Sequence, residues 1–303
     1  MQDRHTHLDA LAAGTMVVLC AAWGFNQVAI KVANAGGIPP VMGAGLRSIG
    51  ACLLLWLWMR ARRQPLFGRD GTLGAGLLAG IGFGAEFLLI YWGLDYTSAS
   101  RGVVFLYTMP FVVALGMHWL VPTERLTRHK LAGLVLAFSG IIAAFAEGLA
   151  LPTGRQWIGD AMLLGAAVLW GGTTILVRVT RLSRVSAAKT LFYQLAVSGL
   201  LLPPLSLAMG EPAPNPAPLA WASLAFQTVL VAFASYLSWF WLITRYPATK
   251  LSAFSFLTPL FGIAFGAMLL NEPLTPTLLL AGALVTVGIW LVNRRTAPPS
   301  LSS

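Results

Sequence analysis

The sequence predicts an all-α polytopic membrane protein, with ten transmembrane helices arranged as two inverted five-helix repeats around a central cavity. Three observations lead to this prediction. The chain of 303 residues is 57% hydrophobic and only 10% charged, whereas a soluble domain carries about 25% charged residues. Its apolar residues gather in runs of about 20, the length that a helix needs to cross a bilayer. The second half of the chain also repeats the first.

The apolar runs define the expected helices. They lie at 9–31, 40–59, 72–94, 99–120, 129–147, 157–179, 187–208, 219–243, 250–270 and 275–293. The connections are short, so neighbouring helices should be antiparallel, and no run alternates with the period of two that a membrane β-strand shows. The N-terminal stretch "MQDRHTHLDA" lacks the apolar core and cleavage site of a signal peptide. The first run is therefore expected to remain as a helix.

The positive charges indicate an orientation in a bacterial inner membrane. With both termini in the cytoplasm, most of the 20 lysines and arginines fall on the cytoplasmic side, as the positive-inside rule requires. The exceptions are Lys31, Arg47, Arg101 and Arg155. The net charge of +10 is then a topology signal, and no nucleic-acid partner is needed to explain it.

The repeat is visible in the sequence itself. The stretch "LCAAWGFNQVAIKV" (19–32) aligns with "AAVLWGGTTILVRV" (166–179), and Pro110 in "YTMPF" aligns with Pro259 in "FLTPL" at nearly the same offset. We therefore divide the chain into a first repeat, 1–148, and a second, 149–303. Because five is odd, the second repeat must cross the membrane in the opposite sense. Inverted repeats are typical of secondary transporters, whose site lies near the midplane.

Two further stretches, "VPTERLT" (121–127) and "LLNEPLT" (269–275), align in the same way. Each carries one glutamate between two apolar runs, which suggests either a buried catalytic acid used twice or a duplicated turn. Proline is tolerated where a helix begins, and the two turns would lie on opposite sides of the membrane. We interpret both as turns, with Glu124 and Glu272 as helix-end charges near the water.

These features also carry a family resemblance that covers nearly the whole chain. Trp-Gly occurs in the first and sixth runs, proline in the fourth and ninth, and a Glu-x-Leu-Thr turn before the fifth and tenth. In them the chain resembles the EamA type of the drug/metabolite transporter superfamily, and within it the bacterial amino-acid exporters, including the aromatic amino-acid exporter. The resemblance implies export of amino acids with apolar or aromatic side chains. The alternative is a broad-specificity exporter of drugs or other amphipathic metabolites.

Polar residues share one face of the first run at helical spacing: Trp23, Asn26, Gln27 and Lys31. The sixth run repeats this face with Trp170, Thr173, Thr174 and Arg178. Polar side chains in membrane helices often serve only to hold helices together. Because a whole face is polar in both copies, we favour a water-accessible cavity.

Two ionisable residues, Arg47 and Glu86, lie within the second and third runs. Counted at about 1.5 Å per residue, they reach similar depths, so a structural salt bridge is one interpretation. In the functional interpretation, Glu86 faces a substrate ammonium or carries a coupling proton, and Arg47 attracts a carboxylate. The two charges would suit a zwitterion. Their repeat mates, Gln194 and Ser235, are neutral.

Aromatic residues interleave with these polar positions, and those on the polar faces are expected to surround an apolar side chain; others belong to interfacial belts. The predicted substrate-binding residues are Trp23, Asn26, Gln27, Arg47, Glu86, Tyr91, Tyr107, Trp170, Thr173, Tyr193, Gln194, Ser235 and Trp239. Pro110 and Pro259 are predicted to break or kink the fourth and ninth helices, as hinges or by freeing carbonyls for binding.

Other functional classes find little support. The chain has no HExxH, GxSxG or P-loop motif and no Cys/His cluster with metal spacing, so neither an enzyme, a metal site nor a cofactor is expected. Cys20 and Cys52 are interpreted as packing groups. A channel or a lipid flippase remains an alternative, although a flippase should open a polar groove to lipid. The expected partners are a small-molecule substrate and membrane lipids, with no obligatory protein partner.

Overall fold

A computed structural model describes residue 5 and residues 7–66, 68, 70–149, 151–270 and 277–294. In this part of the chain every regular element is helical. The α-helices are α1 (Ala10–Ala35), α2 (Pro40–Ala61), α3 (Leu73–Leu94), α4 (Ala99–Leu106), α5 (Met109–Leu120), α6 (Arg128–Phe145), α7 (Gln156–Val179), α8 (Ala187–Ala208), α9 (Pro218–Phe226), α10 (Tyr236–Arg245), α11 (Ala248–Phe254), α12 (Leu257–Leu270) and α13 (Thr277–Asn293). The short elements are η1 (Pro122–Glu124), η2 (Ala146–Gly148), η3 (Arg181–Arg184) and the π-helical η4 (Gln227–Ser235).

These elements form the predicted membrane bundle. Within the described residues, nine helical spans are long and apolar enough to cross a membrane, and the shorter apolar helix α13 adds the tenth. Their outward faces carry large apolar side chains, among them Leu200, Leu279 and Trp119, each more than two-thirds exposed. Such a surface suits lipid as the solvent. The all-α polytopic fold is confirmed.

Several helices begin where the sequence supplies a capping side chain. Asp9 accepts a hydrogen bond from the Ala12 N–H at 2.8 Å before α1, and Ser98, Thr127 and Ser186 cap α4, α6 and α8 in the same manner. At α2, the carboxylate of Glu211 accepts from the Val41 and Met42 N–H groups, both at 3.0 Å. A carboxylate is favourable there because the first amides of a helix lack partners within it.

Three of the spans are not regular helices. The fourth is interrupted at residues 107–108 and the ninth at residues 255–256, and Pro110 and Pro259 lie in the first turns of the helices that follow, α5 and α12. Proline fits in a first turn because its missing N–H has no helical partner there. The eighth span, expected as one run over 219–243, widens into the π-helix η4 between α9 and α10. Wide turns of this kind often occur at functional sites.

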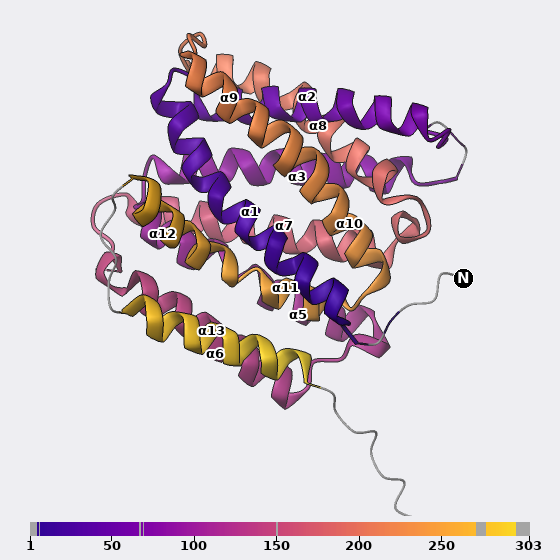
Figure 1. The fold of residues 1–303 in the computed structure, drawn as a ribbon, viewed down its shortest axis with the longest axis vertical. Helices are drawn as coiled ribbons and strands as arrows, with labels where there is room; N and C mark the ends of the chain where they lie inside the picture. Colours follow the sequence, from indigo (N-terminus) through magenta and orange to yellow (C-terminus); the bar gives the residue numbers. More distant parts are fainter. Residues whose placement is uncertain are drawn as a thin grey trace, which may run out of the picture.

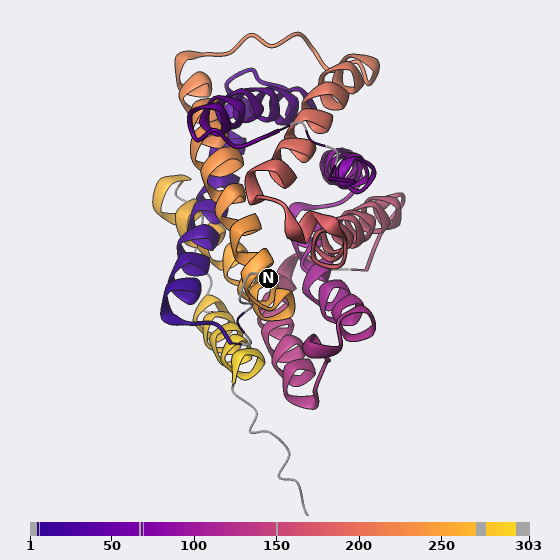
Figure 2. The same cartoon turned by 90° about the vertical axis from the view of Figure 1, so that its right-hand side faces the viewer.

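The helices pack in pairs that follow the repeat. Helices α2 and α8, which are equivalent in the two repeats, pack together along one side of the bundle, and the equivalent α6 and α13 pack along the other (Figure 1). Between them, α1 lies against α12 just as its repeat mate α7 lies against α5. Figure 2 shows the same arrangement from the right-hand side of Figure 1. Exchanging the two repeats preserves these pairings, as a duplicated unit requires.

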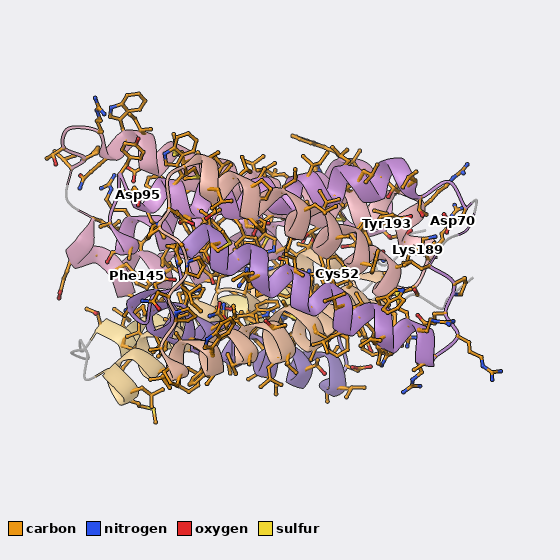
Figure 3. The ribbon with its side chains drawn as sticks, turned by 90° about the horizontal axis from the view of Figure 1, so that it is seen from above. Cys52, Asp70, Asp95, Phe145, Lys189 and Tyr193 are labelled. Atoms are coloured by element: carbon orange, nitrogen blue, oxygen red, sulfur yellow. The ribbon has the colours of Figure 1, made fainter. Side chains whose placement is uncertain are left out.

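The bundle has two chemically different ends. The basic end holds the turns between α2 and α3, α5 and α6, α7 and α8, and α10 and α11; the opposite end holds the alternate turns. Figure 3 shows Asp70, Lys189 and Tyr193 together at the basic end, and Asp95 and Phe145 at the opposite end. An ion pair of 2.7 Å between Lys189 and Asp70 ties the α2–α3 turn to α8.

Candidate functional site

A cavity of about 250 Å³ lies between the two repeats. Its walls come from α1, α3 and α4 of the first repeat and from α7, α8, α10 and α12 of the second. The predicted residues that line it are Trp23, Asn26, Gln27, Glu86, Tyr91, Tyr107, Trp170, Thr173, Gln194 and Trp239. The polar faces of the first and sixth runs therefore meet at one place.

Three predicted residues, Arg47, Tyr193 and Ser235, do not line this cavity. Tyr193 packs towards the basic end, where its hydroxyl lies 3.1 Å from that of Thr72. Ser235 stands behind Trp23 and accepts a hydrogen bond from the indole Nε1–H at 2.8 Å. Its own hydroxyl donates to the Val231 carbonyl within η4. Ser235 therefore fixes the orientation of a lining residue.

Each of the two repeat-related tryptophans packs against another aromatic ring of the cavity wall. The Trp23 ring meets Trp239 edge to face, with ring centroids 5.8 Å apart. The Trp170 ring meets Tyr107 in the same manner at 6.1 Å. The hydroxyls of Thr173 and Thr174 both donate to the Trp170 carbonyl. The hydroxyl protons of these two threonines are therefore engaged within their own helix and are not free to donate to a ligand.

The glycine after each tryptophan brings helices together. A Cβ atom on Gly24 would lie 2.8 Å from the Gly262 nitrogen of α12, and one on Gly171 would lie 2.7 Å from Val112 Cγ1 of α5. Since real Cβ atoms do not approach other atoms so closely, each Trp-Gly pair places the indole on the cavity while the glycine lets its helix pack against the interrupted span. This accounts for the Trp-Gly pair in both repeats.

Glu86 and Arg47 both lie inside the bundle but do not form a salt bridge. Glu86 lines the cavity, and in the described part of the chain its carboxylate makes no hydrogen bond or ion pair. Arg47 is 1% exposed, and its Cζ lies 4.3 Å from the centroid of the Phe87 ring. Since Phe87 lines the cavity and Arg47 does not, this ring covers the guanidinium.

Three polar atoms on the cavity wall also lack hydrogen-bond partners among the described residues: Asn26 Oδ1, Gln194 Oε1 and Thr258 Oγ1. Buried polar groups are nearly always paired in proteins, so unpaired atoms on a cavity wall mark a place for ligand or water. Sequence reasoning missed Thr258, although it directly precedes Pro259. It also missed the apolar lining residues Phe83, Phe87, Ile90, Leu106, Leu163 and Phe240, because apolar side chains that face a cavity look the same in sequence as those that face lipid.

A buried ion pair lies at the basic end. Arg178 of α7 donates to Glu124 Oε1 from Nε at 2.9 Å and from Nη2 at 2.7 Å. Glu124 is 2% exposed, so the expectation that it lies near the water is wrong, although it does lie in the turn between two helices. The turn folds inward beneath the end of α7, and the arginine compensates the carboxylate. Glu272 lies outside the described residues.

At the opposite end the cavity extends to the termini of helices. Its lining reaches Leu94, the last residue of α3, and Ala99, the first residue of α4. Lys31, the repeat mate of Arg178, is exposed at this end, whereas Arg178 is buried. The two ends therefore differ although their sequences are related. Among the residues described, no group of three or more His, Cys, Asp or Glu side chains is placed to hold a metal ion.

Comparisons with known proteins agree with this architecture. The model of the EamA-like transporter family matches residues 10–146 and again residues 157–294. A solved crystal structure superposes with a TM-score of 0.78 over 93% of this chain and 94% of its own. At 18% identity, that likeness shows the fold alone.

Three curated relatives match along nearly their full length. An uncharacterized transporter of Synechocystis sp. is 29% identical, over 97% of this chain and 93% of its own. A probable amino-acid metabolite efflux pump of Salmonella typhimurium is 28% identical, over 91% and 92% respectively. A probable terminal-alkyne amino-acid exporter of Streptantibioticus cattleyicolor is also 28% identical, over 94% of both chains.

Proposed function

Because the chain belongs to the EamA-like transporter family, we propose that it is a secondary transporter that exports amino acids with apolar or aromatic side chains by alternating access. The observation that carries the proposal is the cavity between the repeats, which combines a carboxylate, neutral polar groups and aromatic rings. Such a mixture suits a small amphipathic solute. Relatives described as amino-acid exporters or efflux pumps support the substrate class.

Alternating access requires the two ends to open in turn around one site. The buried Arg178–Glu124 pair holds the basic end closed, while the lining extends to the opposite end. In the other state, the pair separates and the opposite end closes. The helix interruptions at 107–108 and 255–256 occupy equivalent places in the two repeats. We assign Pro110 and Pro259 to these hinges, where a few backbone dihedrals absorb the motion.

The orientation of the protein follows from its charges. Because the positive-inside rule places lysines and arginines in the cytoplasm, the basic end faces the cytoplasm of a bacterium and both termini lie there. In the proposed cycle, the cavity of the state described is the one that faces the outside. Export would begin when the basic end opens and admits a cytoplasmic solute.

Counterflow in proteoliposomes tests this function. Purified protein is reconstituted with an internal load of unlabelled solute, and entry of the labelled solute is followed for amino acids, nucleosides and cationic dyes. We expect rapid exchange of phenylalanine and leucine and little of the nucleosides. Exchange of dyes without exchange of any amino acid would favour the broad-specificity drug exporter over our proposal. Liposomes without protein give the background.

A further inference from the structure

The charged groups on the cavity wall are the starting point. Among its described lining residues, Glu86 is the one acidic side chain, and no lysine, arginine or histidine lines the cavity. A carboxylate with no ion-pair partner inside a protein is costly. A cationic ligand group offsets that cost, whereas an anionic one increases it.

The polar atoms on the wall that lack hydrogen-bond partners also favour a cationic ligand group. Asn26 Oδ1, Gln194 Oε1 and Thr258 Oγ1 can all accept hydrogen bonds, none has a partner among the described residues, and their residues are 6%, 1% and 2% exposed. An ammonium group has three donors and no acceptor. It is thus matched by a wall that offers Glu86 and three further acceptors.

Several donors near the cavity that could hold a carboxylate are already in use. The Trp23 indole N–H bonds to Ser235, and the hydroxyls of Thr173 and Thr174 bond to a carbonyl of their own helix. At the two helix interruptions, the N–H groups of Thr108 and Thr258 already bond to the carbonyls of Phe105 and Ser255. The donors that remain on the wall include tyrosine and threonine hydroxyls and side-chain amides, which carry no formal charge.

Arg47, which the sequence suggested as the group that attracts a carboxylate, is shielded from the cavity. Its guanidinium stacks on the Phe87 ring, and Nη1 and Nη2 make no hydrogen bond to a described residue. A carboxylate in the cavity therefore meets the ring and not the charge.

The rest of the wall accommodates an apolar body. Phe83 meets Phe87 and Tyr236 edge to face, with ring centroids at 5.0 and 5.9 Å. Aromatic faces attract cations as well as apolar groups, so rings next to Glu86 add to the recognition of an ammonium.

We infer that this cavity selects its substrate by the ammonium group, so that its substrate class is primary amines with an apolar body, for which a free carboxylate is dispensable. The inference rests on the proposed function and names the substrate group that the site recognises. Amino acids, their esters and amides, and the corresponding decarboxylated amines all belong to this class. N-acylated amino acids and carboxylic acids without an amine do not.

Competition binding tests the inference. Purified protein in detergent binds tritiated phenylalanine in a scintillation proximity assay, and four unlabelled competitors are compared: phenylalanine methyl ester, phenethylamine, N-acetylphenylalanine and 3-phenylpropionate. Detergent is used because the amines cross lipid bilayers unaided. We expect the ester and the amine to compete within about fivefold of phenylalanine, and the two compounds without an ammonium to be at least tenfold weaker.

Variants of Glu86 test whether this residue is responsible for recognition of the ammonium group. Glu86→Gln should reduce phenylalanine and phenethylamine binding at least tenfold, whereas Glu86→Asp, which retains the charge, should recover part of it. Glu147→Gln is the matched control, since Glu147 is an exposed glutamate outside the cavity. A melting curve for each variant separates lost binding from lost folding.

The outcomes for the two proposals are distinguishable. If N-acetylphenylalanine or 3-phenylpropionate competes as well as phenethylamine, the ammonium inference fails, while amino-acid transport stands on its counterflow result. If phenylalanine does not bind and the counterflow panel shows exchange of dyes alone, the proposed function fails first.

Discussion

Arg178 and Glu124 form a buried ion pair although 54 residues separate them, with Nη2 of the arginine 2.7 Å from Oε1 of the glutamate. The pair joins α7 of the second repeat to the α5–α6 turn of the first. Arg178 Nη1 also donates to the Ile243 and Thr244 carbonyls at 3.4 Å, which adds the end of α10. One guanidinium therefore ties three elements together at the basic end.

This pair predicts a strong effect of Glu124→Gln. Removing one member of a buried pair leaves an uncompensated charge and costs about 3–5 kcal/mol. We expect a melting temperature several degrees lower in detergent, and slower counterflow because the basic end no longer closes firmly. Arg178→Lys should be intermediate, since an ammonium cannot reproduce the two-pronged contact of a guanidinium.

The control for this pair is the exchanged variant, Glu124→Arg with Arg178→Glu. It should regain part of the stability that each single change removes, because the charges again compensate each other. If both single variants melt and transport like the unaltered protein, the pair does not hold the basic end closed.

The sequence predicts the fold of this protein better than it predicts the burial of individual side chains. The fold follows from apolar run length and from repeated pairs such as Trp23-Gly24 and Trp170-Gly171, since both are local patterns. The burial of Glu124 was not predictable, because a glutamate in a turn looks the same whether the turn faces water or folds beneath a helix. Burial depends on the path of the turn, which the spacing of residues does not report.

In the candidate site, too, the sequence predicts what one helix determines but not what depends on packing between helices. Helical periodicity brings Asn26 and Gln27 to the cavity, because one helix sets their relative direction. Whether Arg47 meets Glu86 or stacks on Phe87 depends on side-chain packing between two helices, and depth along each helix cannot decide it. The π-helix that contains Ser235 likewise leaves no signal in the apolar pattern.

A close helix contact predicts the effect of Gly24→Ala. The added methyl would lie 2.5 Å from Phe261 Cβ and 2.8 Å from the Gly262 nitrogen, so α1 must move away from α12. Such overpacking costs about 1–3 kcal/mol, and we expect a lower melting temperature and weaker phenylalanine binding, because Trp23 moves with its helix. Gly14→Ala is the control in the same helix, since nothing lies within 4 Å of its new Cβ. Equal melting temperatures for the two variants would contradict the close contact.

The α2–α3 turn predicts a pH-dependent stability. Hydrogen bonds from Lys189 and Thr72 and the lysine charge lower the pKa of Asp70 from 3.8 to about 2, and Arg181 packs beside the neighbouring Gly71. A lowered pKa in the folded state stabilises the protein above pH 3.8 and ceases to do so as the pH falls towards 2. Asp70→Asn should therefore lower the melting temperature at pH 6, and the difference from the unaltered protein should shrink below pH 4. A difference that stays constant between pH 6 and 3 would exclude this contribution.

The Trp23–Ser235 hydrogen bond predicts a modest loss of both affinity and stability. Ser235→Ala removes the acceptor of the indole N–H, which is 2.8 Å away. A hydrogen bond contributes about 1 kcal/mol, so we expect phenylalanine to bind roughly fivefold more weakly as the ring on the cavity wall loses its fixed orientation. Ser238→Ala is the matched control: its hydroxyl likewise donates to the carbonyl four residues earlier, but it does not line the cavity. If Ser235→Ala and Ser238→Ala bind phenylalanine equally well, the orientation of Trp23 does not contribute to substrate binding.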